Sequence, residues 1–232
     1  MILLDHNDAS AYTGKSGALI GLKQYKDALA ASNQALRLEP DNALAWNSKG
    51  NALNSLKRYN EGIAAYEQVL LLNPDEALAW SNKGYALNSL KRYNEGIAAC
   101  EQALRLEHDL VVAWSNKGNA LNGLKRYDEA LAAYEQALRL APDYVSAWIA
   151  KGNTLYSLKR YDESLAAYDQ FLRLDSHDAK VWRHKGNTLY SLKCYNEALV
   201  AYEQALRLEP DAADILNSKS RVLKKFARKG EA

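Results

Sequence analysis

Residues 43–76 read ALAWNSKGNALNSLKRYNEGIAAYEQVLLLNPDE, and residues 77–110 read ALAWSNKGYALNSLKRYNEGIAACEQALRLEHDL. The two stretches are identical at 25 of 34 positions. The same spacing separates the five tryptophans, which are Trp46, Trp80, Trp114, Trp148 and Trp182. A fixed period of this length indicates a chain built from repeated supersecondary units, each packed on its neighbours, rather than one large core.

Aligning the chain at this period predicts six repeats and two flanking segments. The repeats are 9–42, 43–76, 77–110, 111–144, 145–178 and 179–212. Residues 1–8 are an N-terminal leader, and residues 213–232 continue the pattern as a capping helix and tail, with Leu223 and Phe226 expected on the buried side. A cap of this kind covers the last apolar face of a repeat array.

Each repeat is predicted to contain two helices. The first spans about 43–56 in the second repeat, because apolar residues and Gly50 recur there at spacings of three and four. The second is expected to begin at Asn60 as N-cap, with Glu61 placed favourably in the first turn. A glycine inside a helix costs about 1 kcal/mol relative to alanine. The recurrence of this glycine therefore predicts close packing of the two helices.

This unit resembles the tetratricopeptide repeat, whose 34-residue signature matches Trp46, Gly50, Tyr66 and Pro74. The resemblance covers residues 9–212. It implies an all-α fold, a right-handed α-solenoid (superhelix) of antiparallel helix pairs whose first helices line a concave groove. It also implies a scaffold for protein–protein interaction.

The sequence departs from that signature in one charged position. Lysine replaces the leucine before the glycine, at Lys15, Lys49, Lys83, Lys117, Lys151, Lys185 and Lys219. We expect the aliphatic stem to pack and the ammonium to reach solvent or a nearby Glu; a lysine ladder for anions is the alternative. Three glutamates are expected to pair with arginines four residues later on solvated helix faces, as Glu101–Arg105, Glu135–Arg139 and Glu203–Arg207.

Asparagines are concentrated on the face of the first helices that points away from the apolar stripe, which the resemblance places in the groove. This asparagine ladder comprises Asn51, Asn54, Asn82, Asn88, Asn116, Asn119, Asn122, Asn153 and Asn187. An asparagine amide offers donors and acceptors, so it can pair with both the N–H and the C=O of an extended peptide. Two interpretations stay open: peptide contact, or polar filler copied as the repeats duplicated.

Aromatic and basic residues join this face, mainly towards the C-terminus. They are Tyr85, Tyr156, Arg183, His184, Tyr190 and Arg221. Together they predict that this end of the groove accepts an acidic segment of a protein or peptide partner.

The sequence contains no residue pattern that indicates catalysis, and its charge balance indicates neither a nucleic-acid nor a membrane partner. The 30 basic and 28 acidic side chains give a net charge of +2, and no apolar run is long enough to span a membrane, so neither nucleic acid nor membrane is expected as partner. We expect Cys100 to be a small buried substitute for tyrosine, Cys194 to be more exposed, and both thiols to be free. The four histidines show no metal-ligand spacing. We therefore predict no catalytic site, metal or cofactor, in a soluble cytoplasmic protein.

Three functions remain open at this stage. The first is a scaffold that binds an extended peptide or a partner helix in the concave groove. The second is a self-assembling structural protein, a homo-oligomer of near-identical units. The third is the recruiting or regulatory segment of a larger enzyme or kinase.

Overall fold

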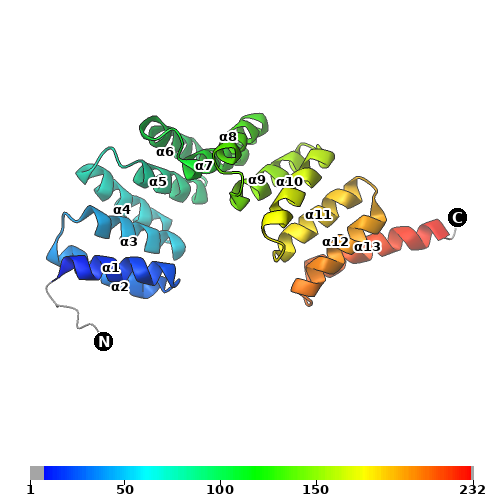
Figure 1. Ribbon diagram of the computed structural model, residues 1–232, viewed down its shortest axis with the longest axis horizontal. Coiled ribbons are helices and arrows are strands. Elements are labelled where there is room, and N and C mark those ends of the chain that lie inside the picture. The colour runs from blue at the N-terminus through cyan, green and yellow to red at the C-terminus, as the bar shows by residue number, and fades with distance from the viewer. Residues whose placement is uncertain (1–7, 231–232) are drawn as a thin grey trace. The chain divides into compact units, whose positions relative to one another are not determined.

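The computed structural model describes residues 8–230, so most of the predicted leader and the last two residues of the tail lie outside the described part of the chain. Over these residues the chain forms thirteen α-helices and no strands. The helices follow one another as stacked pairs within each of two compact units (Figure 1). The predicted all-α solenoid of helix pairs is confirmed.

The two units divide the chain at Arg126. The first unit, Met1–Arg126, contains α1 (Ala9–Gly21), α2 (Tyr25–Leu38), α3 (Ala43–Ser55), α4 (Tyr59–Leu72), α5 (Ala77–Ser89), α6 (Tyr93–Leu106) and α7 (Val111–Gly123). The second, Tyr127–Ala232, contains α8 (Tyr127–Leu140), α9 (Val145–Ser157), α10 (Tyr161–Leu174), α11 (Ala179–Ser191), α12 (Tyr195–Leu208) and α13 (Ala213–Gly230). Odd-numbered helices are called A helices and even-numbered ones B helices. Positions within a repeat are counted from its first residue, so that Ala43 is position 1.

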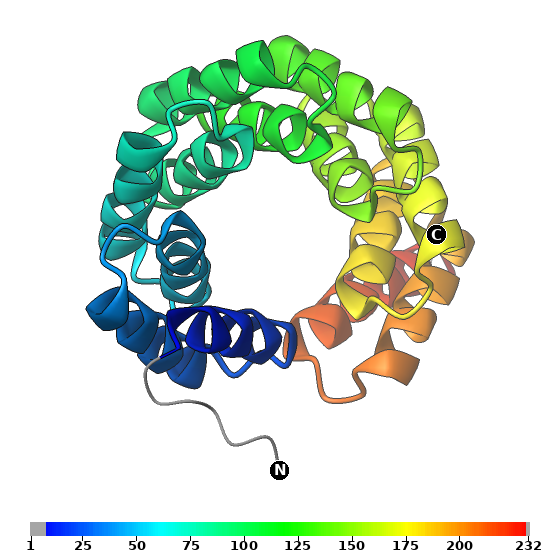
Figure 2. The same cartoon turned by 60° about the vertical axis from the view of Figure 1, so that its left-hand side comes forward.

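Each unit has a layer of A helices and a layer of B helices (Figure 2). Successive A helices contact each other, as α1 does α3 and α9 does α11, whereas no such contact joins successive B helices among the described residues of either unit. The backbones of successive A helices are therefore closer together than those of successive B helices, and this difference bends the stack towards the A helices. The A helices therefore line the inner side of the curvature within each unit.

A lysine in the left-handed backbone region connects the A helix to the B helix of every repeat. The six residues have φ between 59° and 65°: Lys23, Lys57, Lys91, Lys125, Lys159 and Lys193. This conformation commonly ends a helix and favours glycine, because a Cβ is crowded there. In the second repeat the amide of Arg58 then donates to the carbonyl of Leu53 at 2.9 Å, which closes the helix end.

The N-cap of the B helix lies two residues earlier than predicted. The structure starts α4 at Tyr59 with Arg58 as N-cap, so the prediction of Asn60 as N-cap is wrong. Lys57 in the left-handed region reverses the chain directly after the C-cap Leu56, so Arg58 becomes the N-cap of the next helix. The expected acid in the first turn is present, and Glu61 accepts two hydrogen bonds from Arg58, at 2.7 Å from Nε and 2.6 Å from Nη2.

Close packing of the two helices is confirmed at the recurrent glycine. A Cβ added to Gly50 would lie 2.6 Å from Cε1 of Tyr66, and one added to Gly186 would lie 2.5 Å from Cε1 of Tyr202. The tryptophan stays at the repeat edge, where the indole N–H of Trp46 donates to the carbonyl of Pro40 at 2.8 Å. The recurrent glycine, its tyrosine and the tryptophan are therefore structural, and the tryptophan ties each helix pair to the loop that precedes it.

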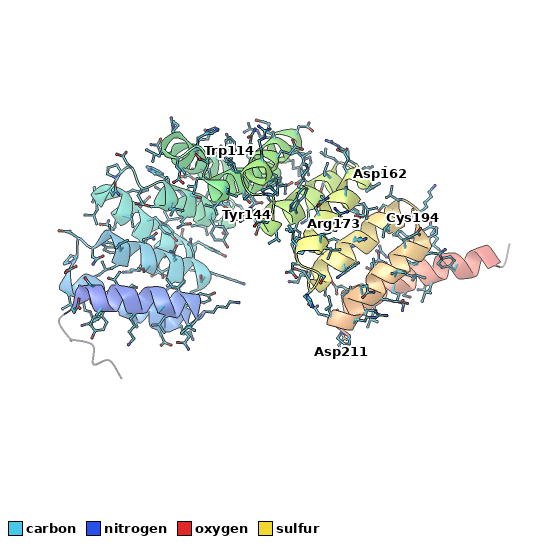
Figure 3. The ribbon with its side chains drawn as sticks, in the orientation of Figure 1. Trp114, Tyr144, Asp162, Arg173, Cys194 and Asp211 are labelled. Atoms are coloured by element: carbon cyan, nitrogen blue, oxygen red, sulfur yellow. The ribbon has the colours of Figure 1, made fainter. Side chains whose placement is uncertain are left out.

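The two cysteines lie in the environments predicted for them. Cys100 is fully buried and a free thiol, and burial raises its pKa to about 12. Cys194 is half-buried at the turn between α11 and α12, at the opposite end of α12 from Asp211 (Figure 3).

In the described part of the chain, five of the six B helices, all except α2, form an ion pair with the A helix that follows. The lysines of position 7 pair with acids sixteen residues earlier, at distances between 2.6 and 2.9 Å: Lys83–Glu67, Lys117–Glu101, Lys151–Glu135, Lys185–Asp169 and Lys219–Glu203. The ammonium groups of Lys83, Lys117, Lys151 and Lys185 also lie over the tryptophan of their own helix, with Lys83 5.4 Å from the centroid of Trp80. The packed lysine stem with a nearby acid is thus confirmed.

These ion pairs correct two alternatives drawn from the sequence. Five of the seven ladder lysines are neutralised by the protein's own acids, which argues against a lysine ladder for anions. The expected pairs within one helix are also wrong, because Glu101, Glu135 and Glu203 face the next repeat instead of the arginine four residues on.

The capping helix α13 is only half covered. Ile215 and Val222 are buried, but Leu223 and Phe226 are 49% and 36% exposed, so their predicted burial is wrong. The equivalent Leu53 is 1% exposed because its own B helix covers it. Among the described residues no B helix follows α13.

No helix among the described residues combines the length and apolar character needed to cross a membrane.

Candidate peptide-binding face

The candidate site is the solvent-facing surface of the A helices, called the concave face below. It is formed by those side chains at positions 2, 5, 6, 9, 12 and 13 that reach solvent, on α1, α3, α5 and α7 in the first unit and on α9, α11 and α13 in the second. Because the A helices lie on the inner side of each stack, consecutive repeats present these positions side by side.

The asparagines of position 9 are hydrogen-bonded to tyrosine hydroxyls of position 24 on the B helix. The Tyr hydroxyl donates to Oδ1 of the asparagine at 2.7 to 2.8 Å in three repeats: Tyr66 to Asn51, Tyr168 to Asn153 and Tyr202 to Asn187. These tyrosines are buried, and burial raises their pKa, to about 12 for Tyr202. The hydroxyls therefore stay protonated and act as donors at neutral pH.

The sequence covaries internally in the way this contact requires. Four repeats have Tyr at position 24, and all four have Asn at position 9. The other two repeats lack both residues: the first has Gly17 with Ser32, and the third has Tyr85 with Cys100. Neither serine nor cysteine can reach across the helix pair as a phenol does. Position 9 is therefore asparagine where a buried hydroxyl needs an acceptor.

This contact fixes the orientation of the amide. Oδ1 of Asn153 accepts from Tyr168 and lies 2.7 Å from Nδ1 of His184, and Oδ1 of Asn51 accepts from Tyr66 and, at 3.3 Å, from Nδ2 of Asn82. Among the described residues, Nδ2 of these two asparagines donates to no protein group. Position 9 thus offers a ligand a donor alone, rather than the donor and acceptor expected from the sequence.

The asparagines of position 6 have the opposite orientation. Nδ2 of Asn82 donates to Asn51, and Nδ2 of Asn116 donates to Oγ of Ser81 at 3.2 Å. Their Oδ1 atoms remain as acceptors on the concave face. The first unit therefore presents donors and acceptors, while the second has Ala150, His184 and Ser218 at position 6.

The asparagines of position 12 correct part of the predicted ladder. Asn54 is buried, 9% exposed, and its Nδ2 donates to the hydroxyl of Tyr66 at 3.1 Å, so it is not on the concave surface. A Cβ on Gly62 would lie 2.5 Å from Oδ1 of Asn54, which accounts for the glycine there. Asn88 is half-buried and donates to the carbonyl of Asn116 at 2.8 Å. Sequence periodicity placed both residues on the groove face, because it could not distinguish an exposed surface from a helix interface.

Asn119 and Asn122 are the remaining members of the ladder, and both lie on α7. Asn119 is exposed and Asn122 is half-buried.

The first unit has a hollow on its concave face that the sequence analysis missed. A cavity of about 340 Å³ lies between α1 and α3, lined by Ser10, Thr13, Gly14, Asn42, Leu44, Asn47 and Ser48. Leu44 is 71% exposed, and Leu78 at the same position of the next repeat is 45% exposed. Oδ1 of Asn47 is buried without a hydrogen-bond partner among the described residues. Leucine at an outward helix position was the available signal.

The second unit presents basic groups on its concave face. The guanidinium carbon of Arg221 lies 5.4 Å from the ring centroid of Tyr190, and Nη2 lies 3.5 Å from Oδ1 of Asn187. Arg183 forms a 2.9 Å ion pair with Asp214, while its Nε is buried without a partner among the described residues. Burial, reinforced by the nearby Arg183 charge, lowers the pKa of His184, which is therefore neutral at pH 7.

The predicted tyrosines are accessible and supported by neighbouring rings. Tyr85 is 44% exposed and contacts Tyr59 edge-on, with ring centroids 6.4 Å apart. Tyr156 is 36% exposed, packs against Tyr161, and its hydroxyl lies 3.3 Å from Oγ of Ser191. Rings held in this way present apolar surface with little loss of side-chain entropy on binding.

Over the described residues, no group of three His, Cys, Asp or Glu side chains is placed to hold a metal ion.

Comparison with known families matches all six repeats. Models described as tetratricopeptide repeat match residues 9–42, 43–76, 77–110, 111–144, 145–178 and 179–212. No curated protein matches the chain.

Several solved structures share the fold at low sequence identity. A chain of the APC/C hetero-tetramer Cut9–Hcn1 superposes with a TM-score of 0.86 at 16% identity, over 95% of this chain and 44% of that one. PilW, a widely conserved type IV pilus biogenesis factor, gives 0.82 at 20% identity, over 93% and 98% of the two chains. YrrB, a TPR protein with an unusual peptide-binding site, gives 0.61 at 23% identity, over 82% and 98%.

Proposed function

The chain belongs to the tetratricopeptide repeat family, and we propose that it is a non-enzymatic scaffold that binds an extended peptide or a partner helix on its concave face. The family and its structural neighbours support a role in protein–protein interaction. The observation that carries the finer proposal is the fixed orientation of the position 9 amides, whose donors face outward while buried tyrosines hold their oxygens.

In the first unit, the polar groups complement an extended backbone. Nδ2 of Asn51 donates to a peptide carbonyl, and Oδ1 of Asn82 or Asn116 accepts from a peptide N–H. The buried, unpaired Oδ1 of Asn47 supplies a further acceptor beside the hollow. Leu44 at the hollow takes an apolar side chain of the ligand.

In the second unit, an excess of hydrogen-bond donors and a positive charge favour an acidic ligand. Asn153 and Asn187 offer donors there, and no asparagine of position 6 balances them with acceptors. Arg221 adds a fixed positive charge, because its stacking on Tyr190 holds the guanidinium at the surface. A carboxylate accepts from both kinds of donor in a charge-assisted hydrogen bond.

The test changes the donor while keeping the acceptor that the tyrosine needs. In the triple variant N51D/N153D/N187D each residue retains an oxygen for the tyrosine hydroxyl but loses Nδ2 and gains a negative charge. The matched control, N60D/N94D/N196D, makes the same chemical change at exposed positions of the B helices. The probe is a displayed library of random peptides, selected on the wild-type chain and followed by fluorescence anisotropy of enriched sequences.

We expect the enriched peptides to lose affinity about tenfold or more for the first variant and to keep it for the control. Affinity for acidic peptides should also fall as salt is raised, since the charged contacts are exposed. Equal binding to both variants would refute the role of the asparagines and leave them as filler.

Self-assembly is the second proposal, because near-identical repeats could dock on one another. Light scattering over a range of concentrations distinguishes it: a monomer at high concentration excludes it. Extension of the native reading frame past Ala232 would favour the third, a recruiting segment of a larger enzyme.

A further inference from the structure

Among the described residues, five junctions between repeats contain an acid–lysine pair. In all five, the same three positions of the B helix carry the same residue types. The residues are apolar at position 21, acidic at position 25 and Leu at position 28: Ile63/Glu67/Leu70, Ile97/Glu101/Leu104, Leu131/Glu135/Leu138, Leu165/Asp169/Leu172 and Leu199/Glu203/Leu206. Their spacing of i, i+4 and i+7 puts all three on one side of a helix. The chain thus contains five copies of one helix-docking pattern.

The receiving surface is equally regular. Ile63 packs in one cluster with Leu87 and Ala99 of the next repeat, and Leu131 does so with Leu155 and Ala167. The acid pairs with the lysine of position 7, whose side chain is only 20% to 28% exposed in these junctions. A receiving surface is therefore an apolar strip from positions 4, 11, 14 and 23, with one lysine beside it.

The end face formed by α1 and α2 has this receiving surface without an occupant among the described residues. A cavity of about 470 Å³ lies there, lined by Tyr12, Lys15, Leu19, Asp27, Ala30, Ala31 and Gln34. Lys15 is exposed and forms no ion pair with any residue of the described range 8–230, and Leu22 at position 14 is 69% exposed.

A hollow at the equivalent repeat positions of the second unit lies beside a receiving surface that is already covered by a helix. That cavity of about 330 Å³ is lined by the same repeat positions, including Trp182, Lys185 and Leu189, and also by Leu165 and Asp169 of the preceding B helix. Lys185 pairs with Asp169 at 2.6 Å. The occupant of the surface is an amphipathic helix whose acid neutralises the lysine.

We propose that the α1–α2 end face binds an amphipathic helix of a partner protein with Leu or Ile at i, Asp or Glu at i+4 and Leu at i+7. Docking buries Leu19 and Leu22 and gives Lys15 the carboxylate that the other junctions supply. The proposal is independent of peptide binding on the concave face, because it uses the opposite edge of α1 and the surface of α2.

A second folded copy of this chain does not fit the role. The five acids of the pattern already pair with lysines of their own chain, so offering one would mean breaking a junction. The remaining B helix, α2, has Asn33 at position 25 and lacks the acid.

The direct probe is a fluorescein-labelled peptide of residues 127–140, YDEALAAYEQALRL, titrated with the full chain. An isolated helix of this length is marginal in water, so a hydrocarbon staple joins the positions of Asp128 and Ala132, which are both exposed. We expect saturable binding that Lys15→Glu or Leu22→Asp weakens about fivefold or more. Lys26→Glu, with the same charge change at a neighbouring exposed position, should leave it unchanged.

Charge exchange makes the test specific. A peptide with Glu135→Lys should bind the wild type weakly and the Lys15→Glu variant about as well as the original pair. Absence of binding at millimolar peptide, or binding that Lys15→Glu and Leu22→Asp do not affect, would overturn the proposal. It would also be overturned if light scattering showed self-association of the wild type that these two substitutions abolish, since the occupant would then be a second copy.

Discussion

Removing the acceptor of a buried tyrosine hydroxyl should destabilise the second unit, and Asn153→Ala is the cleanest case. Tyr168 is 1% exposed, its hydroxyl donates to Asn153 at 2.7 Å, and its other neighbour is Nδ1 of His184 at 3.5 Å. A buried donor left without its acceptor costs about 1–3 kcal/mol. Alanine regains about 0.5 kcal/mol of helix propensity relative to asparagine. The expected net loss is therefore about 0.5–2.5 kcal/mol.

The companion substitution Tyr168→Phe removes the donor and should cost about 1 kcal/mol by itself. In the double variant neither group is left unpaired, so its loss should be smaller than the sum of the two single losses by about 1 kcal/mol. The third repeat already lacks both groups, with Tyr85 and Cys100 in these places. Asn196→Ala, at an exposed position of α12, is the control and should change stability little.

Hydrogen exchange of the α9 and α10 amides is the suitable assay, because repeat arrays open locally and a single unfolding transition averages over them. One kcal/mol corresponds to about a fivefold change in protection. The reasoning is refuted if Asn153→Ala leaves protection unchanged, or if the two single effects add in the double variant.

Three further changes test the scaffold. Lys49 lacks an acid sixteen residues earlier, where Asn33 stands, and burial lowers the pKa of Lys49, so keeping it charged at neutral pH costs folding free energy. Asn33→Glu should raise that pKa and stabilise the first junction by about 0.2–1 kcal/mol, measured by urea denaturation against Asn33→Gln. Gly17→Ala should stabilise α1 by up to about 1 kcal/mol because nothing lies within 4 Å of the added Cβ, whereas Gly186→Ala should destabilise because that Cβ meets Tyr202; equal melting shifts would contradict the packing. Lys159→Gly should stabilise the α9–α10 turn by about 1 kcal/mol because φ is 61°, and a loss in calorimetry would argue against backbone strain there.

Much of the fold could be predicted from the sequence because every repeat contains the same short-range sequence signals. Helical spacing of apolar residues, the recurrent glycine and the proline-containing connections predicted helix pairs to within a few residues of the observed ends. The misplaced N-cap at Asn60 shows the limit, because the left-handed lysine before it is set by backbone geometry that a side-chain pattern does not reveal.

The candidate site could be predicted only in part. Periodicity placed Asn51 and Asn153 on the outward face, and the structure puts them there, half-buried. The same periodicity put Asn54 outside, although that side chain lies under the edge of the B helix and bonds Tyr66. A helical pattern resolves the direction of a side chain within its own helix, but not how far the neighbouring helix extends over it.

The amino-acid pattern alone predicts the period, the pairing of helices within each repeat and the residue types on each face. The tertiary structure alone decided which end of each amide is free, because that depends on a tyrosine hydroxyl fifteen residues away on another helix. It likewise decided that position 7 lysines pair with acids sixteen residues earlier and that Lys15 and Leu22 are left open at the end face. These are contacts between helices, and the short-range spacing that reveals a helix carries no information about its neighbours' register.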